Sequence, residues 1–450
     1  MQKGSIDLRF EADNTVRADA RGVHESSLLH GSPWVCYNEK LIADVGGEMS
    51  KQSQQTEWTT AELKQRLDRK EKLFVLDVRN RDVFATWKIE SSEKLTTLNA
   101  PYVEMLEQGG KDDVVECVIA YAQQELAQKL PKDQPIAVVC AKGRTSALVA
   151  EGLRKLGYGA VTLQGGMLSW SDFYEFKPII ASSALRIFQI SRPARGCLSY
   201  IVASEGHAAV IDPLRHHEKY LDFARTKNFA IKLVLDTHGH ADHISSGRAL
   251  TDDVRVPYYL HPYDAIHPID ILPAAIDYEP LRDGQEFSVG TSKIKTMHIP
   301  GHTLGNAVYL LDGEYLFTGD SIFIESISRP DLGGRGETWA PLHYRSLRKL
   351  LQLPDSVTVL PGHFSSPREA NGQGLFAATL GGLKKKNEGL KIAQKSEGEF
   401  VSYILSNLPA FPPQYVEIKR VNAGLVVADE EKASELELGK NVCALAQAYV

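Results

Sequence analysis

Residues 237–243 read Thr-His-Gly-His-Ala-Asp-His and follow an apolar run that ends at Leu235. A short apolar run predicts a buried strand, and the glycine after it favours a tight turn at the end of that strand. Four residues of the turn carry side chains that bind metal ions: His238, His240, Asp242 and His243. Imidazole and carboxylate groups are the ligands that zinc and iron take in proteins. The stretch therefore predicts a metal site just past a strand.

Three further ligand-type residues stand in similar places along the chain: His302, Asp320 and His363. Each is preceded by a glycine and follows a segment with the pattern of a strand. Asp320 comes after a predicted hairpin, residues 308–317, whose Asp312-Gly313 turn is typical of a two-residue connection. Loops at one edge of a sheet are where α/β proteins build active sites, so we expect all seven residues at one edge.

The composition of the whole chain excludes several classes of protein. At 450 residues the chain has room for two or three domains. A net charge of −6 leaves no basic excess for nucleic-acid phosphates, and no apolar run reaches the ~20 residues of a membrane helix. The five cysteines are odd in number and form no C-x-x-C pair, which predicts no disulfide framework and favours a cytoplasmic location.

Three regions follow one another along the chain. Residues 1–55 are polar and have little periodicity, which is typical of a disordered tail. The alternative is a translated leader with Met49 as the true start, because the codons of Gly46-Gly47-Glu48 can form a ribosome-binding site. N-terminal sequencing of protein made from the native gene distinguishes the two.

The second region, residues 56–176, has the pattern of a small α/β domain with a parallel sheet. Strands are predicted at residues 72–78, 136–139 and 161–163, and a helix at 146–156. A first helix is predicted after Thr59 or Thr60, which are good N-caps. Residues 175–183 are expected to be a linker. The third region, 184–450, alternates strands with helices and becomes mostly helical after Gly374, which predicts a layered α/β sandwich with a helical C-terminal extension.

A cysteine loop lies in the second region, where residues 140–146 read Cys-Ala-Lys-Gly-Arg-Thr-Ser between a predicted strand and a predicted helix. Backbone N–H groups of such a loop can face the Cys140 sulfur, and the helix N-terminus adds positive potential. Lys142 and Arg144 add two cations. All of these favour a thiolate, which is the form of cysteine that accepts sulfur.

The seven-residue metal motif resembles the metallo-β-lactamase fold superfamily over residues 184–370, which implies an αββα sandwich. Two branches of that superfamily fit. Hydroxyacylglutathione hydrolases hold two metal ions with all seven residues, which suits thioester hydrolysis. Persulfide dioxygenases hold one Fe(II) with His238, His302 and Asp320 only. Such a facial triad leaves three positions open for a persulfide and O₂.

Several segments resemble the persulfide dioxygenase branch more closely. Residues 328–331, Ser-Arg-Pro-Asp, are similar to its Gly-Arg-x-Asp segment, with Ser328 in place of glycine. Arg329 is expected either to bind an anionic substrate or to hold its own loop through Asp331. Residues 196–200 and 210–213 and the tail 412–422 also resemble that branch. The tail is similar to bacterial forms fused to rhodanese domains.

Residues 56–174 resemble rhodanese sulfurtransferases through Asp77-Val78-Arg79, the Cys140 loop and the closing segment 163–170. The loop departs from the thiosulfate-type pattern at Ala141, where an arginine is usual. The resemblance implies catalytic roles for Cys140, Lys142 and Arg144.

Together the resemblances imply a persulfide dioxygenase with one Fe(II) per chain, fused to a sulfurtransferase. The expected partners are a small thiol persulfide, O₂ and thiosulfate or sulfite, with no nucleic acid and no membrane; a homo-oligomer and the identity of the thiol carrier stay open. Four residues would orient water and substrate: His240, Asp242, His243 and His363. The alternatives are a dinuclear hydrolase, in which these four help to hold two zinc or iron ions, and a redox sensor in which Cys140 is oxidised.

Overall fold

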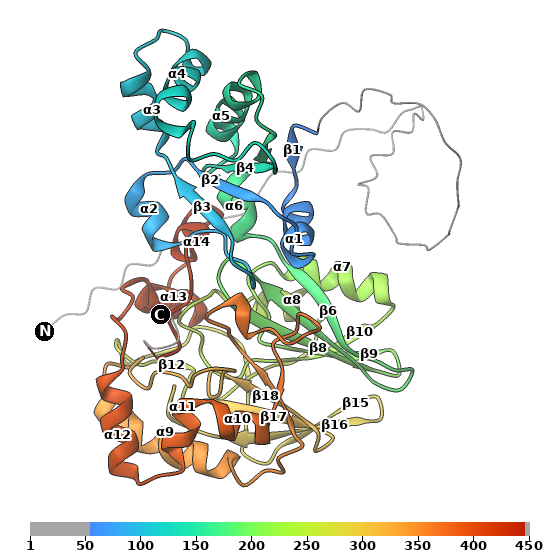
Figure 1. The fold of residues 1–450 in the computed structure, drawn as a ribbon. Helices are drawn as coiled ribbons and strands as arrows, with labels where there is room; N and C mark the ends of the chain where they lie inside the picture. The colour runs from blue at the N-terminus through green and yellow to red at the C-terminus, as the bar shows by residue number, and fades with distance from the viewer. Residues whose placement is uncertain (1–54, 446–450) are drawn as a thin grey trace, which may run out of the picture. The chain divides into compact units, whose positions relative to one another are not determined.

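The first domain is built on a five-stranded parallel sheet, and the computed structural model describes residues 55–445 (Figure 1). The expectations for the leader and for Met49 lie outside the described residues. The sheet order is β1-β5-β4-β2-β3. The strand bounds are β1 Glu57–Trp58, β2 Phe74–Asp77, β3 Thr96–Asn99, β4 Ile136–Val139 and β5 Ala160–Leu163. The three predicted strands of this domain are therefore confirmed, within a few residues at their ends.

Helices cover both faces of the parallel sheet. Helices α3 (Tyr102–Gly109), α4 (Val114–Tyr121) and α5 (Arg144–Lys155) pack on one face through Met105, Val118 and Val149. Helices α1 (Thr60–Asp68) and α6 (Gly166–Ser171) pack on the other through Leu63 and Trp170. The short α2 is Arg81–Thr86 and the π-helical turn η1 is Ala122–Leu126.

The predicted start of the first helix is confirmed in detail. The Thr59 hydroxyl accepts a hydrogen bond from the Glu62 backbone N–H at 3.2 Å, and the Glu62 carboxylate accepts one from the Thr59 N–H at 2.8 Å. This reciprocal capping box satisfies two backbone donors that a helix end otherwise leaves open.

The predicted linker at residues 175–183 is wrong, because most of it is a strand. Strand β6 (Glu175–Ala181) pairs antiparallel with β7 (Arg186–Arg192) at the edge of the next sheet. An edge strand tolerates a proline such as Pro178, because one side of the strand needs no hydrogen-bond donors. The pairing therefore begins only a few residues after α6.

Two mixed sheets face each other in the second domain: β9, β10, β11 and β14 pair in parallel within the larger sheet, whereas β6 to β9 pair antiparallel. The seven-stranded sheet has the order β14-β11-β10-β9-β8-β7-β6, and the six-stranded sheet runs β15-β16-β17-β18-β19-β20. The remaining bounds in the first sheet are β8 Cys197–Ser204, β9 His207–Ile211, β10 Ala230–Leu235, β11 Tyr258–Leu260 and β14 Glu279–Pro280. In the second they are β15 Glu286–Val289, β16 Ser292–His298, β17 Ala307–Leu311, β18 Tyr315–Gly319, β19 Thr358–Pro361 and β20 Ala378–Thr379. A small separate ribbon joins β12 (Ile266–His267) to β13 (Leu272–Pro273).

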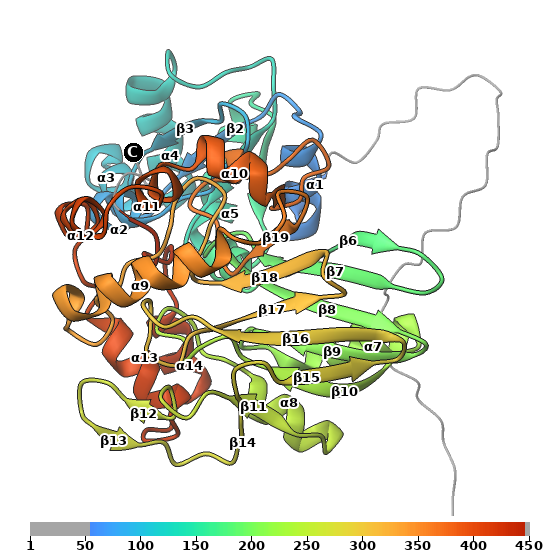
Figure 2. The same cartoon turned by 90° about the horizontal axis from the view of Figure 1, so that it is seen from below.

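Helices enclose the two sheets, as Figure 2 shows. Tyr220 of α7 (His217–Lys227) and Leu250 of α8 (Gly247–Val254) join the apolar core on the outer face of the seven-stranded sheet. On the outer face of the other sheet lie α9 Gly336–Leu350, α10 Leu380–Lys386, α11 Glu388–Ala393 and α12 Glu397–Ser406. The expected αββα sandwich is confirmed.

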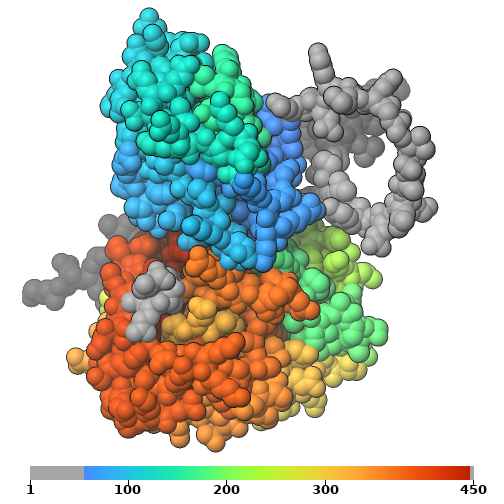
Figure 3. All heavy atoms as spheres, in the orientation of Figure 1, coloured from blue at the N-terminus to red at the C-terminus, as the bar shows by residue number. Residues whose placement is uncertain are grey.

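The C-terminal extension is helical, as expected, and continues with α13 (Gln414–Asn422) and α14 (Glu430–Leu436). The short 3₁₀ turn η2 (Pro367–Glu369) precedes β20. In the space-filling view, the orange and red atoms of this extension cover much of the visible face of the two-sheet domain (Figure 3). Within residues 55–445, every helix is too short or too polar to span a membrane.

Candidate functional site

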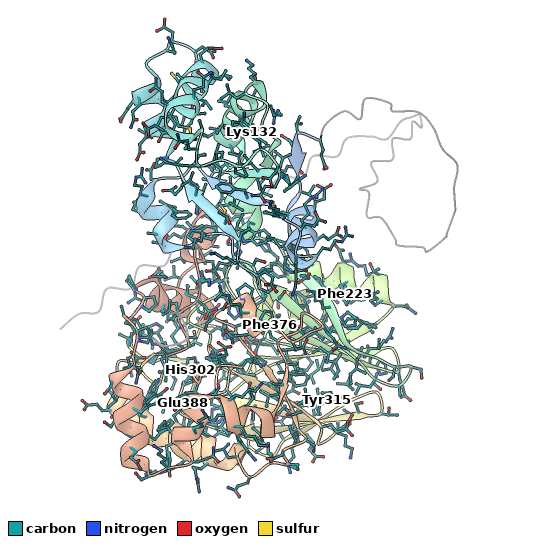
Figure 4. The ribbon with its side chains drawn as sticks, in the orientation of Figure 1. Lys132, Phe223, His302, Tyr315, Phe376 and Glu388 are labelled. Atoms are coloured by element: carbon teal, nitrogen blue, oxygen red, sulfur yellow. The ribbon has the colours of Figure 1, made fainter. Side chains whose placement is uncertain are left out.

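The metal-type residues lie on four loops at one edge of the two sheets. His238 follows β10, His302 follows β16, Asp320 follows β18 and His363 follows β19. Figure 4 marks His302 in the interior of the two-sheet domain. The glycines beside these residues allow the loops to approach closely: a Cβ on Gly362 would lie 2.5 Å from the Asp320 Oδ1 atom. The expected convergence at one sheet edge is therefore present.

Three side chains form the first cluster, and each is at most 1% exposed: His238, His302 and Asp320. The Asp320 Oδ2 atom lies 3.5 Å from His302 Nε2 and 3.9 Å from His238 Nε2. All three atoms are buried and have no hydrogen-bond partner among the described residues. Burying polar atoms without partners is costly, so the cluster fits a bound cation at its centre.

The outer ring nitrogens of these histidines are held by hydrogen bonds. The Nδ1 atom of His302 lies 2.8 Å from the Arg329 carbonyl oxygen, and that of His238 lies 2.9 Å from the Thr237 hydroxyl. A carbonyl only accepts, so Nδ1 of His302 donates and its Nε2 is left as a free electron pair. Burial lowers the pKa of both imidazoles, which keeps them in the neutral form that binds metal.

His240 belongs to a separate group with Asp212 and Asp236, although its ring centroid lies 4.2 Å from that of His238. Its Nε2 atom lies 3.3 Å from Asp212 Oδ1 and 3.8 Å from Asp236 Oδ1. Burial lowers the pKa of His240, but the two carboxylates outweigh burial and hold the pKa well above its usual value. Those two acidic residues were not predicted as site residues, because nothing in the local sequence shows which histidine they will meet.

A second cluster contains Cys197, Asp242, His243 and His363, all buried. His363 lies between two carboxylates: its Nε2 is 2.6 Å from Asp242 Oδ2 and its Nδ1 is 2.5 Å from Asp320 Oδ1. The Cys197 sulfur lies 3.4 Å from Asp242 Oδ2. Burial lowers the pKa of His363, and the two carboxylates raise it well above its usual value. The fourfold donor set is also able to hold a metal ion.

Cys443 lies at the same edge and was not predicted. Its sulfur is within 4.8 Å of ligand atoms of Asp320 and His363. The C-terminal segment brings it there through a bridge between Ser328 and Ala444. No local pattern around Cys443 predicts its approach to Asp320 and His363, because this contact joins segments far apart in the chain.

Arg329 is fully buried and its donors are occupied by the protein. It forms a two-pronged ion pair with Asp331 at 2.6 and 2.9 Å. The same guanidinium donates to three carbonyl oxygens, those of Pro409, Ala410 and Val442. These contacts favour the loop-holding role of Arg329 and Asp331 over substrate binding, and they anchor the C-terminal segment as well.

A buried ion pair connects the metal loop to the end of the first domain. One Glu437 oxygen accepts from the Ile244 N–H at 2.7 Å, and the other lies 2.5 Å from Arg192. Arg192 also donates to the Ser171 carbonyl at 2.6 Å. The loop that carries His243 is therefore fixed to the end of α6.

The cysteine loop of the first domain has the expected form. The Cys140 sulfur accepts a hydrogen bond from the Gly143 N–H at 3.1 Å, at the N-terminus of α5. The loop requires Gly166, because a Cβ there would lie 2.4 Å from the Cys140 carbonyl oxygen. Lys142 and Arg144 are exposed. Both cations can therefore meet an anionic sulfur donor from solvent.

Comparisons with known proteins agree with this division. Residues 192–363 match the metallo-beta-lactamase superfamily, and residues 59–173 match the rhodanese-like domain. An uncharacterised protein of Mycobacterium leprae is 32% identical over 197 residues, which are 38% of this chain and 87% of that protein. A hydroxyacylglutathione hydrolase of Pelagibacter ubique is 29% identical over 253 residues, or 55% of this chain and 96% of that protein. The solved structure of ETHE1 from Myxococcus xanthus has a TM-score of 0.42 at 25% identity and covers 56% of this chain and 99% of its own.

Proposed function

Because this chain belongs to the metallo-beta-lactamase superfamily and carries a rhodanese-like domain ahead of the metal domain, we propose that it is a persulfide dioxygenase joined to a sulfurtransferase. The proposed reaction is R-S-S⁻ + O₂ + H₂O → R-SH + SO₃²⁻ + H⁺. The outer sulfur is oxidised to sulfite, O₂ is reduced by four electrons, and water supplies the third oxygen of sulfite.

The separation of His240 from the first cluster supports one metal ion. Nε2 of His238, Nε2 of His302 and Oδ2 of Asp320 face one another without other partners. The ligand atoms of His240 group with Asp212 and Asp236 rather than with these three, and its Nε2 lies 3.3 Å and 3.8 Å from their carboxylates, without a hydrogen bond to either. Two histidines and one carboxylate are the ligand set of mononuclear Fe(II) oxygenases. When bound there, Fe(II) supplies open positions for the persulfide anion and O₂.

The surrounding residues have roles that follow from their contacts. The Arg329 carbonyl orients the His302 ring, and the Thr237 hydroxyl orients the His238 ring. Such partners fix the direction of a ligand and strengthen its binding. Asp242 and His363 lie beside Asp320, where they can orient water or the outer sulfur by hydrogen bonds.

We assign sulfur transfer to Cys140. Its sulfur lies at the N-terminus of α5 with two exposed cations in the same loop, so an anion such as thiosulfate can approach it. Attack by the Cys140 thiolate on the outer sulfur of thiosulfate releases sulfite and leaves a persulfide on Cys140. The reverse step forms thiosulfate from sulfite.

The second candidate function is a dinuclear thioester hydrolase. The donor set of Cys197, Asp242, His243 and His363 favours it, because these four side chains can hold a second ion. The similarity to a hydroxyacylglutathione hydrolase also supports it. This function requires His240, whose ring nitrogens also have no hydrogen-bond partner among the described residues, to serve as a further ligand beside His238.

Metal analysis of anaerobically purified protein separates the two functions. The dioxygenase requires about one iron per chain, whereas the hydrolase requires about two ions. The thioester S-lactoylglutathione serves as the control substrate, and only the dinuclear enzyme hydrolyses it.

A further inference from the structure

A cavity of about 180 Å³ lies beside the two loops that carry His238 and His302. Thr303 and Leu304, which directly follow His302, form part of its wall, and Lys419 of α13 forms another part. The other lining residues are Tyr263, Asp264, Ile266, Pro268, Ile271, Arg335 and Trp339. The sequence did not predict a binding role for this segment.

Asp264 joins the cavity wall to both metal loops. Its Oδ2 atom accepts from the Gly239 N–H at 2.8 Å and from the Thr303 hydroxyl at 2.6 Å. Its Oδ1 atom accepts from the Gly305 N–H at 2.9 Å. Because a Cβ on Gly305 would lie 2.6 Å from the Asp264 carboxyl carbon, this packing is close. A ligand in the cavity therefore contacts Asp264, which hydrogen-bonds to both of these loops.

The segment that carries the cavity rim is also fixed to α13. Figures 1 and 2 both draw β12 beside that helix, and Asp270 pairs with Arg420 at 2.7 Å. The His267 Nε2 atom lies 3.2 Å from the Val416 carbonyl oxygen. The segment from β12 to β13 and helix α13, which both contribute to the cavity region, are therefore held to each other.

Two cations of the cavity have no carboxylate within ion-pair distance among residues 55–445. Lys419 is only 8% exposed, and the one contact of its ammonium is the Gly239 carbonyl oxygen at 2.5 Å. Arg335 is exposed at the rim and has no side-chain partner in the described part of the chain. A buried ammonium with one neutral partner is costly, and an anion in the cavity offsets that cost.

Apolar side chains surround the entrance. Five of them are exposed although they are large: Tyr263 59%, Ile266 41%, Ile269 43%, Ile271 64% and Leu272 50%. They lie within ten residues of one another, and three of them line the cavity. Exposed apolar side chains that line a cavity favour binding of an apolar part of a ligand.

Resting on the proposed function, we infer that this cavity receives the sulfur-bearing arm of a phosphopantetheine-type thiol, such as coenzyme A, in preference to glutathione. Pockets that enclose whole ligands measure about 300–1,000 Å³, so 180 Å³ holds an arm only. The sulfur-bearing end of the pantetheine arm, cysteamine joined to β-alanine, is unbranched and carries no charge near its sulfur. Glutathione has charged groups on both sides of its cysteine, which an apolar wall would leave unpaired.

The two cations then have separate roles. Lys419, next to Gly239, meets the persulfide anion at the inner end of the arm and directs it towards the metal loops. Arg335, at the rim, meets the phosphate groups that stay outside. This arrangement places the two negative ends of one ligand on the two unpaired cations.

Binding of the persulfides of coenzyme A and glutathione, measured without oxygen, tests the inference without turnover. We expect calorimetry on the full chain to show coenzyme A persulfide binding at least about 10-fold more tightly than glutathione persulfide. Lys419→Met keeps the aliphatic stem and should weaken binding of coenzyme A persulfide by about 10-fold, since it removes the contact with the persulfide anion. Ile271→Asp alters only the exposed rim and should weaken it several-fold. Val427→Asp is the matched control, because Val427 is 95% exposed and does not line the cavity.

Equal or tighter binding of glutathione persulfide overturns the inference, and so does unchanged binding of coenzyme A persulfide in both Lys419→Met and Ile271→Asp. The result is independent of the proposed function. Binding of coenzyme A persulfide that both variants weaken, with no oxygen uptake from any persulfide, keeps the cavity assignment and rejects the dioxygenase. Oxygen uptake with coenzyme A persulfide that neither variant affects keeps the dioxygenase and rejects the cavity assignment.

Discussion

The Oδ2 atom of Asp320 lies 3.5 Å from Nε2 of His302, and both atoms are buried without a hydrogen-bond partner among the described residues. A carboxylate and a neutral imidazole do not satisfy each other when the imidazole nitrogen carries no proton. The Arg329 carbonyl imposes that form on His302 by accepting a hydrogen bond from its Nδ1–H group. A cation between the two atoms satisfies both of them.

Removing the charge of Asp320 should therefore remove the metal. Asp320 is the one anionic residue in the first cluster, so Asp320→Asn is expected to lower bound iron to below about a tenth of the wild-type amount. Oxygen uptake should be lost with it. Elemental analysis of the purified variant measures the first effect, and an oxygen electrode the second.

Asp242→Asn is the matched comparison, since Asp242 contacts His363 rather than the first cluster. We expect most of the iron to remain and the activity to fall. A second ion in the wild type, together with loss of all metal in Asp242→Asn, contradicts the mononuclear site.

His240 should be dispensable for metal binding. Its ring faces Asp212 and Asp236, so His240→Gln is expected to keep about one iron per chain, whereas His302→Gln loses it. Elemental analysis of the two variants in parallel checks this. Equal metal loss in both variants would place His240 among the ligands.

Sulfur transfer and oxygen uptake should separate at Cys140. Cys140→Ser keeps the loop shape but cannot form a persulfide, so transfer from thiosulfate to cyanide should disappear. Oxygen uptake with a pre-formed small persulfide should change by less than about two-fold. Cys117→Ser is the control, because Cys117 is buried in α4 of the same domain. Loss of oxygen uptake in Cys140→Ser alone makes transfer through Cys140 an obligatory step.

The buried pair of Arg192 and Glu437 should stabilise the fold in a pH-dependent way. Burial raises the pKa of Glu437, but Arg192 and Arg215 outweigh burial and hold it below its usual 4.5. The folded carboxylate therefore binds protons more weakly than the unfolded one. Its contribution is complete above about pH 4.5 and is lost as the pH falls through the folded pKa.

Glu437→Gln removes this charge and should lower the free energy of unfolding by about 3–5 kcal/mol at neutral pH. Urea titrations at several pH values should show the gap to the wild type narrowing as the pH falls below 4.5. Glu435→Gln in the adjoining helix α14 is the control, since Glu435 is exposed and its carboxylate pairs only with Lys432 among residues 55–445. A gap that does not depend on pH contradicts the assigned role of the Glu437 charge.

Arg329→Lys should affect stability more than substrate affinity. Lysine cannot reproduce the two-pronged pair with Asp331 and three carbonyl contacts, so a loss of about 2–3 kcal/mol is expected. The KM for the persulfide should change by less than about two-fold. Thermal unfolding and oxygen-uptake kinetics measure the two effects. A large rise in KM at unchanged stability would instead make Arg329 a substrate-binding residue.

Local patterns predicted much of this architecture. The strand before Cys140, the helix after it, the hairpin with the Asp312-Gly313 turn and the ligands past strand ends all depend on a few neighbouring residues. Turn glycines and apolar runs carry that information. The edge strand β6 was not predicted, because its residues do not alternate regularly between buried and exposed positions and because it contains Pro178. Its strand conformation depends on antiparallel pairing with β7.

Contacts between distant segments could not be predicted. The donors of Arg329 meet carbonyl oxygens of Pro409, Ala410 and Val442, and backbone carbonyls have no sequence signature. Lys419 and Cys443 reach the metal loops only through the C-terminal extension. The orientation of His240 depends on Asp212 and Asp236, which approach it from neighbouring strands.

Oxygen consumption with a defined persulfide tests the central claim most directly. Anaerobically purified, iron-loaded protein is mixed with a small thiol persulfide in an oxygen electrode, and the sulfite formed is quantified. The account predicts one O₂ consumed and one sulfite formed for each persulfide. No oxygen uptake, combined with rapid hydrolysis of S-lactoylglutathione by protein that holds two metal ions, would contradict it.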